Sequence, residues 1–493
     1  MTVGFQNSAS PIAPLQRNAM QLMMAGQIRP AIQAFRDLIA ARPAPMADDW
    51  YNLAYLLRCD RQFEAALKHY DQALALGIPQ PEDVYLNQAA ILSEHLHRQD
   101  AALDALTIAL ERNSRFVPAW FNLATIHEDR GQAQEARTAY RHILDLYPDN
   151  GRAHARLTAI DLYHDQAVDA LNRLTHVMGQ SGLHAEDRAE LHFASGLALD
   201  AAQKFDEAFV HFQQGNQLAR QLIDPALAYD RAAMDRMVDG LIAHVPEQSG
   251  ARQMEDSEER SAPIFICGLF RSGSTLAERL IGRHSRVTAG GEHESIPAIA
   301  AGLPSPATLS SSQIVQLRNQ YRSEIDAAFP DASLITDKRP DNFLHIGLIK
   351  QLFPDAKIIH TRRNLLDNIL SIYFLYFADG ISYGFDLDDI VHYVRCYDRL
   401  MQHWRSLYGE DIIDLDYDAL VQHPETVMRA VLSALDLPWE EDCARTRNDN
   451  AAVKTASSWH VRKPLNDRSS GRWRNYARQM DDVRRALGDA IEA

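Results

Sequence analysis

Residues 263–284, PIFICGLFRSGSTLAERLIGRH, carry the clearest chemistry in this chain. The apolar residues 264–267 predict a buried strand, which leads through a turn containing Gly268 and Gly273 into an amphipathic helix. Glycines let backbone N–H groups converge on an anion, and the start of a helix favours negative charge. We therefore expect this turn to bind a phosphate-like group.

The same turn differs from the loop of nucleotide triphosphatases at one decisive position. Gly268 and Gly273 have the spacing of that loop, but Ser274 stands where the loop requires lysine. A metal-binding acid after a strand is also not apparent in the sequence. The anion is therefore expected not to be the triphosphate of ATP, and a kinase or triphosphatase is disfavoured.

Apolar strands alternate with helices from residue 263 onward, which predicts a parallel sheet with flanking helices. The expected strands are PIFICG, SLITDK, AKIIHTRR and DIIDLDY. Ligands of such sheets bind at the carboxyl ends of the strands. The residues that follow the first three strands should therefore converge on one site: Arg271, Ser272, Gly273, Ser274 and Thr275, then Asp337, Lys338 and Arg339, then Arg362, Arg363 and Asn364.

The first half of the chain contains self-similar segments of about 34 residues that resemble the tetratricopeptide repeat. One unit begins DDWYNLAYLLRCDRQFEAAL and another AWFNLATIHEDRGQAQEART, and weaker units cover residues 153–177 and 191–218. Small residues at equivalent positions let paired helices approach closely, here Ala31, Ala66, Ala102 and Ala136. Five or six units are expected to stack into an α solenoid with a concave groove.

These patterns divide the chain into a solenoid and an α/β domain. We expect a repeat array at 12–246, ending in a capping helix near 229–245, then a polar linker at 247–262 and the α/β domain at 263–493. The groove of such an array commonly holds a peptide or another protein. Self-association or structural support are the alternatives.

Composition limits the classes of protein that fit. The chain has 493 residues, 46% of them hydrophobic and 24% charged, as in soluble proteins of more than one domain. A net charge of −16 disfavours a general nucleic-acid binder. With no visible signal peptide or membrane-spanning run, a cytoplasmic protein with no membrane partner is expected. The cysteines indicate neither a disulfide framework nor a zinc site: Cys59, Cys267, Cys396 and Cys443.

Three ordered motifs make residues 260–480 resemble sulfotransferases that use 3′-phosphoadenosine 5′-phosphosulfate (PAPS). FRSGST is similar to the family's 5′-phosphosulfate loop, and RRNLLDNILS, with Arg363 and Ser371, is similar to its 3′-phosphate motif. RKPLNDRSSGRWRNY resembles the basic loop that closes over the cofactor. Arg271 stands where cytosolic small-molecule enzymes carry lysine. This places the resemblance with protein-tyrosine sulfotransferases and their bacterial tetratricopeptide-linked relatives.

The resemblance implies a sulfotransferase fold, PAPS as donor, PAP as product and no metal. Arg362 is expected to be a surface or substrate-side charge rather than a second 3′-phosphate ligand. The implied cofactor-binding residues are Arg271, Ser272, Gly273, Ser274, Thr275, Arg363, Ser371, Arg468, Ser470, Gly471, Arg472 and Trp473.

Catalytic roles follow from the same resemblance. Arg271 and Lys338 would neutralise the bridging and leaving oxygens, and Ser457 would contact the leaving side with Lys338. Because the reference pKa of tyrosine is about 10, a positioned base helps to deprotonate such an acceptor. The interval from Arg271 places that base at Glu292, with His293 and Glu294 as rivals.

The sequence thus predicts sulfuryl transfer from PAPS to a hydroxyl, tyrosine or another, on a protein or peptide presented by the repeat array. The alternatives are a carbohydrate, lipid or small-metabolite acceptor, or a non-catalytic repeat scaffold. Exposed ends of the array also make a homodimer plausible.

Overall fold

The computed structural model describes residues 12–243, 261–303, 309–377, 381–445 and 470–488. It forms two compact units: residues 1–128 with 132–146, and residues 129–131 with 147–493. The boundary between these compact units falls inside the repeat region. The later helix pairs therefore share a compact unit with the α/β part. Most of the expected linker at 247–262 lies outside the described residues, so that linker stays a prediction.

The first unit consists of antiparallel helix pairs. Ala31, Ala66, Ala102 and Ala136 are fully buried on the second helix of successive pairs, as the repeat pattern predicts. Small side chains at these points allow the close helix packing that defines tetratricopeptide repeats. The helices are α1 (Ile12–Met24), α2 (Ile28–Ala41), α3 (Ala47–Cys59), α4 (Phe63–Ala75), α5 (Pro81–Ala90), α6 (Gln99–Arg112), α7 (Val117–Asp129) and α8 (Ala133–Leu146).

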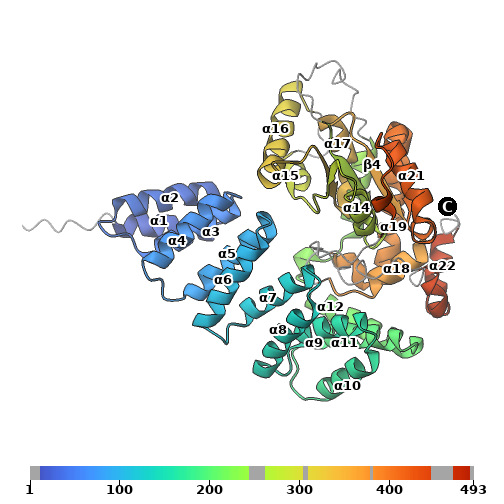
Figure 1. Ribbon diagram of the computed structural model, residues 1–493, viewed down its shortest axis with the longest axis horizontal. Coiled ribbons are helices and arrows are strands. Elements are labelled where there is room, and N and C mark those ends of the chain that lie inside the picture. Colours follow the sequence, from blue (N-terminus) through green and yellow to red (C-terminus); the bar gives the residue numbers. More distant parts are fainter. Residues whose placement is uncertain (1–11, 244–260, 304–308, 378–380, 446–469, 489–493) are drawn as a thin grey trace, which may run out of the picture. The chain divides into compact units, whose positions relative to one another are not determined.

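The second unit begins with two more pairs of the same kind. Ala170 and Ala208 are fully buried at the equivalent positions. Gly196 packs so tightly against Phe212 that a Cβ there would lie 2.7 Å from the ring. The helices are α9 (Gly151–Tyr163), α10 (Ala167–Met178), α11 (Ala185–Ala201), α12 (Phe205–Leu222) and α13 (Arg231–Ala243), labelled in part in Figure 1.

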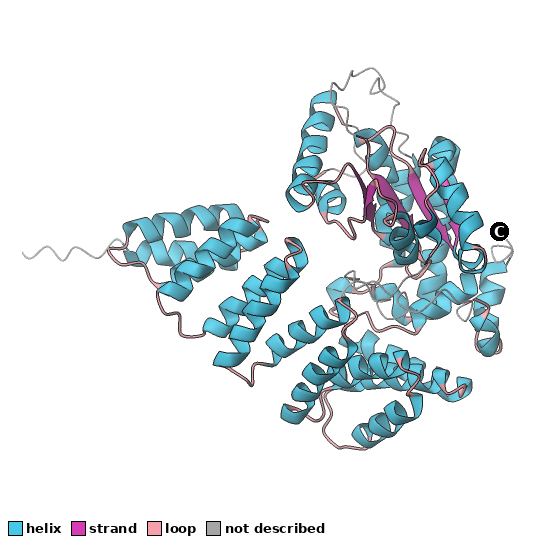
Figure 2. Ribbon diagram, in the orientation of Figure 1, coloured by secondary structure: helices cyan, strands magenta, loops and turns pink. Residues whose placement is uncertain are grey.

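The α/β part is built on a five-stranded parallel sheet with the order β2-β3-β1-β4-β5 (Figure 2). The strands are β1 (Ile264–Gly268), β2 (Val287–Thr288), β3 (Leu334–Lys338), β4 (Ile358–Arg362) and β5 (Ile412–Asp416). The four predicted strands are confirmed. The edge strand β2 was missed because two residues are too short to show alternation.

Helices cover both faces of the sheet because alternate residues of its strands point to opposite sides. Ile264 and Ile266 of β1 belong to one apolar cluster, whereas Phe265 and Cys267 belong to the other. The first cluster includes α14 (Ser274–Ile281), α20 (Tyr417–Gln422) and α21 (Pro424–Ala434). The second includes α16 (Ser311–Ala328), α17 (Ile346–Leu352), α18 (Leu365–Tyr373), α19 (Leu387–Tyr408) and α22 (Asp481–Leu487).

The last repeat helices share this second core. Phe212 of α12 stacks on Phe374 with ring centroids 3.7 Å apart, and Asn216 Nδ2 donates to the Tyr373 carbonyl at 2.9 Å. Helix α13, expected as a cap on the array, packs against α19 of the α/β part. The repeat helices from residue 185 onward therefore contribute to the core of the α/β part.

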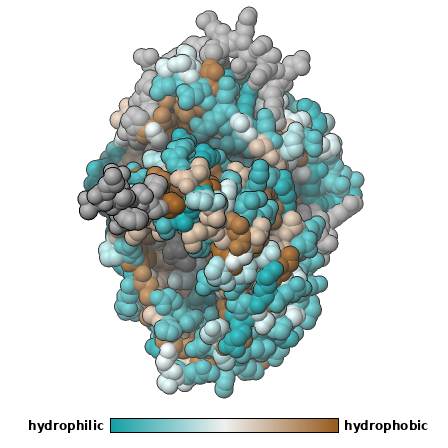
Figure 3. Space-filling view, turned by 90° about the vertical axis from the view of Figure 1, so that its left-hand side faces the viewer, coloured by the Kyte–Doolittle hydropathy of each residue, from teal (hydrophilic) through white to brown (hydrophobic). Residues whose placement is uncertain are grey.

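Large exposed hydrophobic side chains among the described residues are spread along the helical region. On the face shown in Figure 3, hydrophobic residues are interspersed among hydrophilic ones. The exposed residues are Met24, Met46, Tyr55, Leu76, Ile108, Tyr147, Val168, Val210, Leu227 and Met237. Among the described helices, none combines the length and apolar character needed to cross a membrane.

Candidate functional site

The turn between β1 and α14 requires glycine at two points. A Cβ on Gly268 would lie 2.5 Å from the Thr361 carbonyl, and a Cβ on Gly273 would lie 2.5 Å from the Tyr417 ring. Gly273 also has a φ of 102°, in the left-handed region that other residues rarely adopt. The glycine-turn prediction is thus supported by both space and backbone conformation.

Neighbouring elements hold the turn in place. Ser272 Oγ lies 2.7 Å from Thr361 Oγ1, and Asn368 Nδ2 of α18 donates to the Phe270 carbonyl at 2.8 Å. The Ser272 N–H donates back to the Leu269 carbonyl at 3.1 Å. The N–H groups available to bind an anion are therefore those that follow, at the start of α14. The first N–H groups of a helix have no acceptor within the helix.

The residues expected at the 3′-phosphate contact the glycine turn directly. Arg271 Nε donates to Ser371 Oγ at 3.1 Å, and Arg363 Nη1 donates to the Arg271 carbonyl at 3.3 Å. Arg363 also lies over the Tyr417 ring, 4.9 Å from its centroid. Burial, together with the charges of Arg363 and Arg472, lowers the pKa of Arg271 to about 10. This concentration of positive charge would be relieved by an anion.

Lys338 and Glu292 meet at the end of β3. The Lys338 side chain is only 1% exposed and its Nζ contacts Glu292 Oε1, whereas the Glu292 side chain is 41% exposed. The Lys338 N–H donates to the Gly291 carbonyl at 2.9 Å, which fixes the loop after β2 against the strand. A buried cation thus orients a carboxylate that solvent and an incoming molecule can reach.

The three residues considered as the base point in different directions. Glu292 contacts Lys338, whereas Glu294 accepts from Arg339 Nη1 at 2.6 Å. The His293 ring packs edge-on against Phe329, with centroids 5.7 Å apart. Glu292 therefore lies against Lys338, a predicted catalytic residue.

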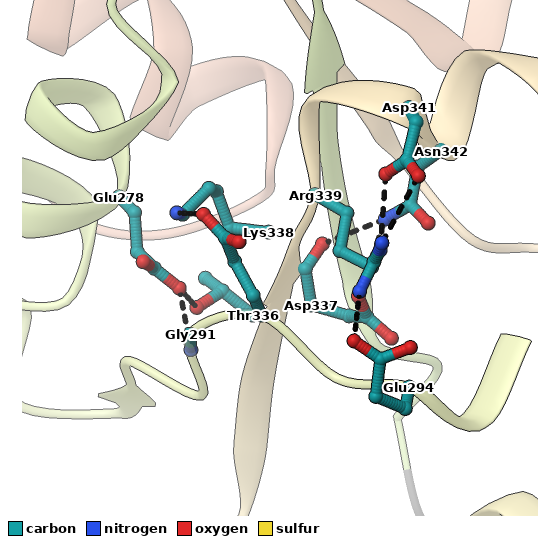
Figure 4. A network of polar contacts seen from close by, with 10 residues as sticks. Glu278, Gly291, Glu294, Thr336, Asp337, Lys338, Arg339, Asp341 and Asn342 are labelled. Atoms are coloured by element: carbon teal, nitrogen blue, oxygen red, sulfur yellow. Dashed lines mark hydrogen bonds and ion pairs between the residues drawn. The ribbon is translucent and has the colours of Figure 1, made fainter. Parts of the chain in front are cut away.

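Glu278 is a supporting residue that the sequence analysis missed. It is buried on α14, where it accepts from the Gly291 N–H at 2.9 Å and from Thr336 Oγ1 at 2.7 Å (Figure 4). Burial raises the pKa of its carboxyl. It links the helix of the glycine turn to the loop that carries Glu292. Its place on an amphipathic helix gave no signal that distinguished it from a surface acid.

Asp337 lies on the opposite side of β3 from Lys338, away from the expected point of convergence (Figure 4). It accepts from Tyr321 OH at 3.0 Å and from Asn342 Nδ2 at 3.2 Å, and burial raises its pKa to about 7. The alternation of side chains along a strand separates these neighbours. Asp337 therefore supports the sheet rather than the site.

The segment SGRW is fastened to the start of α18. The N–H groups of Gly471 and Trp473 donate to the two oxygens of Asp367 at 2.5 and 2.7 Å. Ser470 Oγ contacts Asp418, whose other oxygen accepts from the Asn364 N–H at 3.0 Å. The segment is thus held next to Arg363, although neither aspartate was among the expected site residues.

The side chains of this segment have neighbours of their own. Arg472 Nη2 lies 2.6 Å from Asp200 Oδ2, and its guanidinium lies over the Phe374 ring. The buried indole N–H of Trp473 has no acceptor among the described residues. Two expected site residues, Arg468 and Ser457, lie outside the described part of the chain.

Most expected residues therefore gather at the carboxyl ends of β3, β1 and β4, which are adjacent in the sheet. The Arg271–Ser371 contact lies over β1 and β4, and the Lys338–Glu292 contact lies at β3. Glycine-turn amides, guanidinium groups and a buried lysine suit an anion with more than one charged group. The carboxylate beside them can accept a proton from a bound hydroxyl.

Comparison with known families finds one match in the helical part of the chain and one in the α/β part. Residues 263–441 match the family described as the sulfotransferase family, and residues 96–151 match the tetratricopeptide repeat. The α/β part therefore contains a sulfotransferase-family domain, and the helical part contains tetratricopeptide repeats.

The alignments with individual relatives cover different fractions of the chain. An uncharacterised protein of Aquifex aeolicus is 28% identical over 432 residues, which cover 83% of this chain and 55% of that protein. Protein-tyrosine sulfotransferase A of Caenorhabditis elegans is 28% identical over 209 residues, covering 38% of this chain and 53% of that enzyme. The chain thus spans about half the length of these two relatives.

A solved structure with some likeness is the sulfotransferase domain of the Synechococcus PCC 7002 olefin synthase. It is 19% identical, with a TM-score of 0.35, and covers 44% of this chain and 89% of that domain.

Proposed function

We propose that this chain, which joins tetratricopeptide repeats to a sulfotransferase-family domain, transfers the sulfuryl group of PAPS to a hydroxyl acceptor. The observation that carries the proposal is that Arg271, in the glycine turn, contacts both Ser371 and Arg363. Burial, followed by the neighbouring charges of Arg363 and Arg472, lowers the pKa of Arg271 to about 10, and an anion bound beside these guanidinium groups would offset both effects. Distant similarity to protein-tyrosine sulfotransferases supports the same reaction class.

The residues present fit PAPS. The glycine turn is packed so closely that it admits no Cβ at Gly268 or Gly273, which keeps the start of α14 free of side chains there, and the buried Trp473 N–H has no acceptor among the described residues. Arg363 and Ser371 would hold the 3′-phosphate, because a guanidinium forms paired, charge-assisted hydrogen bonds with phosphate. The amides at the start of α14 would hold the 5′-phosphosulfate. PAPS, when bound, supplies an activated sulfuryl group.

The chain's own residues would supply orientation, charge stabilisation and a proton acceptor. Arg271 and Lys338 would stabilise the negative charge that grows on the oxygens around sulfur, an effect worth about 10²–10³ in rate for each such group. Glu292 Oε1 or Oε2 would take the proton of the acceptor hydroxyl. The contact with Lys338 orients that carboxylate before the acceptor arrives.

Calorimetry with PAP tests donor binding on the full chain. We expect saturable binding by the wild-type protein and at least tenfold weaker binding by Arg363→Ala, by analogy with other lost charge-assisted contacts of about 1.5–3 kcal/mol. Arg429→Ala is the matched control, because Arg429 lies on α21 against Trp439 and Glu425. Absence of PAP binding in the wild type would overturn the proposal, as would unchanged binding in Arg363→Ala.

We further propose that the acceptor is a tyrosine or another hydroxyl on a protein or peptide bound by the repeats. The coexistence of tetratricopeptide repeats and a sulfotransferase-family domain supports this choice. Incubating the protein with labelled PAPS and a cell lysate tests it by mass spectrometry. Label on protein side chains is the expected result, and label confined to carbohydrate, lipid or small metabolites would identify the alternative acceptor class.

A further inference from the structure

Three side chains capable of binding a metal meet where α13 packs against α19. Asp235 lies on α13, and His392 and Cys396 lie one helical turn apart on α19. One ligand atom from each residue lies within 4.8 Å of the other two. The i, i+4 spacing places the imidazole and the thiol on the same face of α19.

The distances between these atoms approach those of a tetrahedral zinc site. Cys396 Sγ lies 3.4 Å from Asp235 Oδ1, His392 Nε2 lies 3.3 Å from Asp235 Oδ2, and Sγ lies 4.0 Å from Nε2. Zinc bonds of about 2.0–2.3 Å in tetrahedral geometry separate neighbouring ligand atoms by about 3.3–3.6 Å. Only small side-chain movements are therefore needed to surround an ion.

Tyr229 orients the histidine for this role. Its hydroxyl lies 2.9 Å from His392 Nδ1, so the other ring nitrogen, Nε2, faces Asp235 and Cys396. Histidine ligands of metals commonly engage their second nitrogen in such a contact, which fixes the tautomer and the ring plane. Neighbouring side chains therefore contact both ring nitrogens of His392.

Access and charge at the junction also suit a bound cation. Cys396 is buried, whereas the side chains of Asp235 and His392 are 44% and 21% exposed, which leaves one side open to solvent. Arg399 is the opposing charge, with Nη1 3.7 Å from Asp235 Oδ1. Its Nη2 contacts Asp239, so a second carboxylate is available to Arg399 when Asp235 turns to a metal.

We propose that Asp235, His392 and Cys396 bind a divalent ion of the zinc class. The ion would take Cys396 Sγ, His392 Nε2 and an Asp235 oxygen as ligands, with a solvent molecule as the fourth. Binding replaces the thiol proton by the metal and releases that proton to solvent. The site would fasten the last repeat-region helix to the α/β part, and it does not depend on the proposed sulfotransferase activity.

This site could not be recognised from the pattern of cysteines in the sequence. Cysteine pairs with short spacing were the expected signal of zinc, whereas this site uses one cysteine. Asp235 is separated from His392 by 157 residues, so the third ligand is evident only in the folded chain. The alternative is a hydrogen-bonded cluster that holds the same two helices together without an ion.

Titration of the full-length, chelator-treated protein with Co²⁺ distinguishes these cases. We expect one Co²⁺ per chain with a near-ultraviolet thiolate-to-cobalt absorption band, which Zn²⁺ then displaces. Cys396→Ser should abolish the band, and His392→Gln should weaken Co²⁺ binding more than about tenfold. Cys59→Ser is the control, because Cys59 is an exposed cysteine in the other compact unit.

A second measurement covers the case in which Cys396→Ser does not fold. Zn²⁺ should raise the melting temperature of the wild-type protein and of Cys59→Ser, but not that of His392→Gln, whose amide can still hydrogen-bond to Asp235. A wild-type protein without a thiolate band would overturn the proposal. The proposal would also be overturned if the thiolate band persisted in Cys396→Ser, or if Zn²⁺ still raised the melting temperature of His392→Gln.

Discussion

Arg472, in the segment expected to close over the cofactor, forms an ion pair with Asp200 at the end of repeat helix α11. The two residues are 272 positions apart, and their side chains are 26% and 15% exposed. Tyr476 OH also contacts Asp200. A single carboxylate of the repeat region therefore holds two side chains of the segment that flanks the candidate donor site.

This ion pair should contribute measurably to stability because it is largely shielded from solvent. Asp200→Asn and Arg472→Gln are each expected to lower the free energy of unfolding by about 1–3 kcal/mol, since each leaves a buried polar group without its charged partner. The double variant should lose less than the sum of the two. Urea denaturation of the four proteins gives the coupling energy.

An exposed ion pair in the same chain serves as the control for that cycle. Arg98 and Glu64 lie 2.6 Å apart, but their side chains are 54% and 62% exposed. Solvent screening should limit their coupling to less than about 1 kcal/mol. Equal coupling energies for the two pairs would contradict the view that the ion pair of Arg472 with Asp200 holds the SGRW segment on α11.

Replacing Glu292 should separate proton transfer from donor binding. Glu292→Gln keeps the size and hydrogen-bonding shape of the side chain but removes its ability to accept a proton. We expect turnover to fall by about 10²–10⁴, the usual range for a general base, with PAP affinity nearly unchanged. Initial rates with labelled PAPS, together with PAP calorimetry, measure the two quantities.

Glu294→Gln is the matched control for this variant. Glu294 is two residues away but pairs with Arg339 instead of Lys338. Its substitution should leave turnover within a few fold of the wild-type value. If Glu294→Gln and Glu292→Gln lost activity equally, the base would have to be sought elsewhere in the loop.

Local patterns in the sequence were sufficient to predict the elements that carry the site. The apolar run before Gly268 predicted β1, and the alternation of strands and helices predicted the parallel sheet, because both depend on side-chain periodicity. The repeat alanines were equally informative, since Ala31 and Ala66 recur at fixed intervals and are fully buried. The three ordered motifs predicted that Arg271, Arg363 and Ser371 belong to one site, and these residues contact one another in the structure.

The supporting contacts could not be predicted because they join residues distant in sequence. Glu278, Asp367 and Asp200 occupy helical positions that resemble ordinary surface acids, and only the folded chain reveals their partners. The packing of the later repeats on the α/β core was also hidden. Phe212 stacks on Phe374, 162 positions further along the chain, and composition gives no sign of such a contact.

Gly273→Ala should damage the glycine turn more than a strained backbone alone would. A Cβ at this position would lie 2.5 Å from the Tyr417 ring, and the φ of 102° is unfavourable for alanine. We expect PAP binding to fall at least tenfold, with a stability loss above about 1 kcal/mol. Calorimetry and urea denaturation report the two effects.

Gly182→Ala separates the effect of backbone strain from the effect of the clash with Tyr417. Gly182 has a similar φ of 95°, but a Cβ there would meet nothing within 4 Å. This variant should therefore lose about 1 kcal/mol through backbone strain and keep full PAP affinity. A Gly273→Ala protein that matched Gly182→Ala in both measurements would show that contact with Tyr417 is unimportant.

Asp337 should make stability decline with rising pH in a defined window. Burial raises its pKa from 3.8 to about 7 in the folded protein, so the native state keeps a proton that the unfolded chain releases. Between about pH 4 and pH 7 the native state therefore binds more protons, and its stability falls as pH rises. Asp337→Asn carries no charge, so the stability of the wild type relative to this variant should fall across the window, by on the order of 1 kcal/mol per pH unit at most. Urea denaturation of both proteins from pH 4.5 to 8 measures the difference; a constant or rising difference would contradict a carboxyl that is buried in its neutral form.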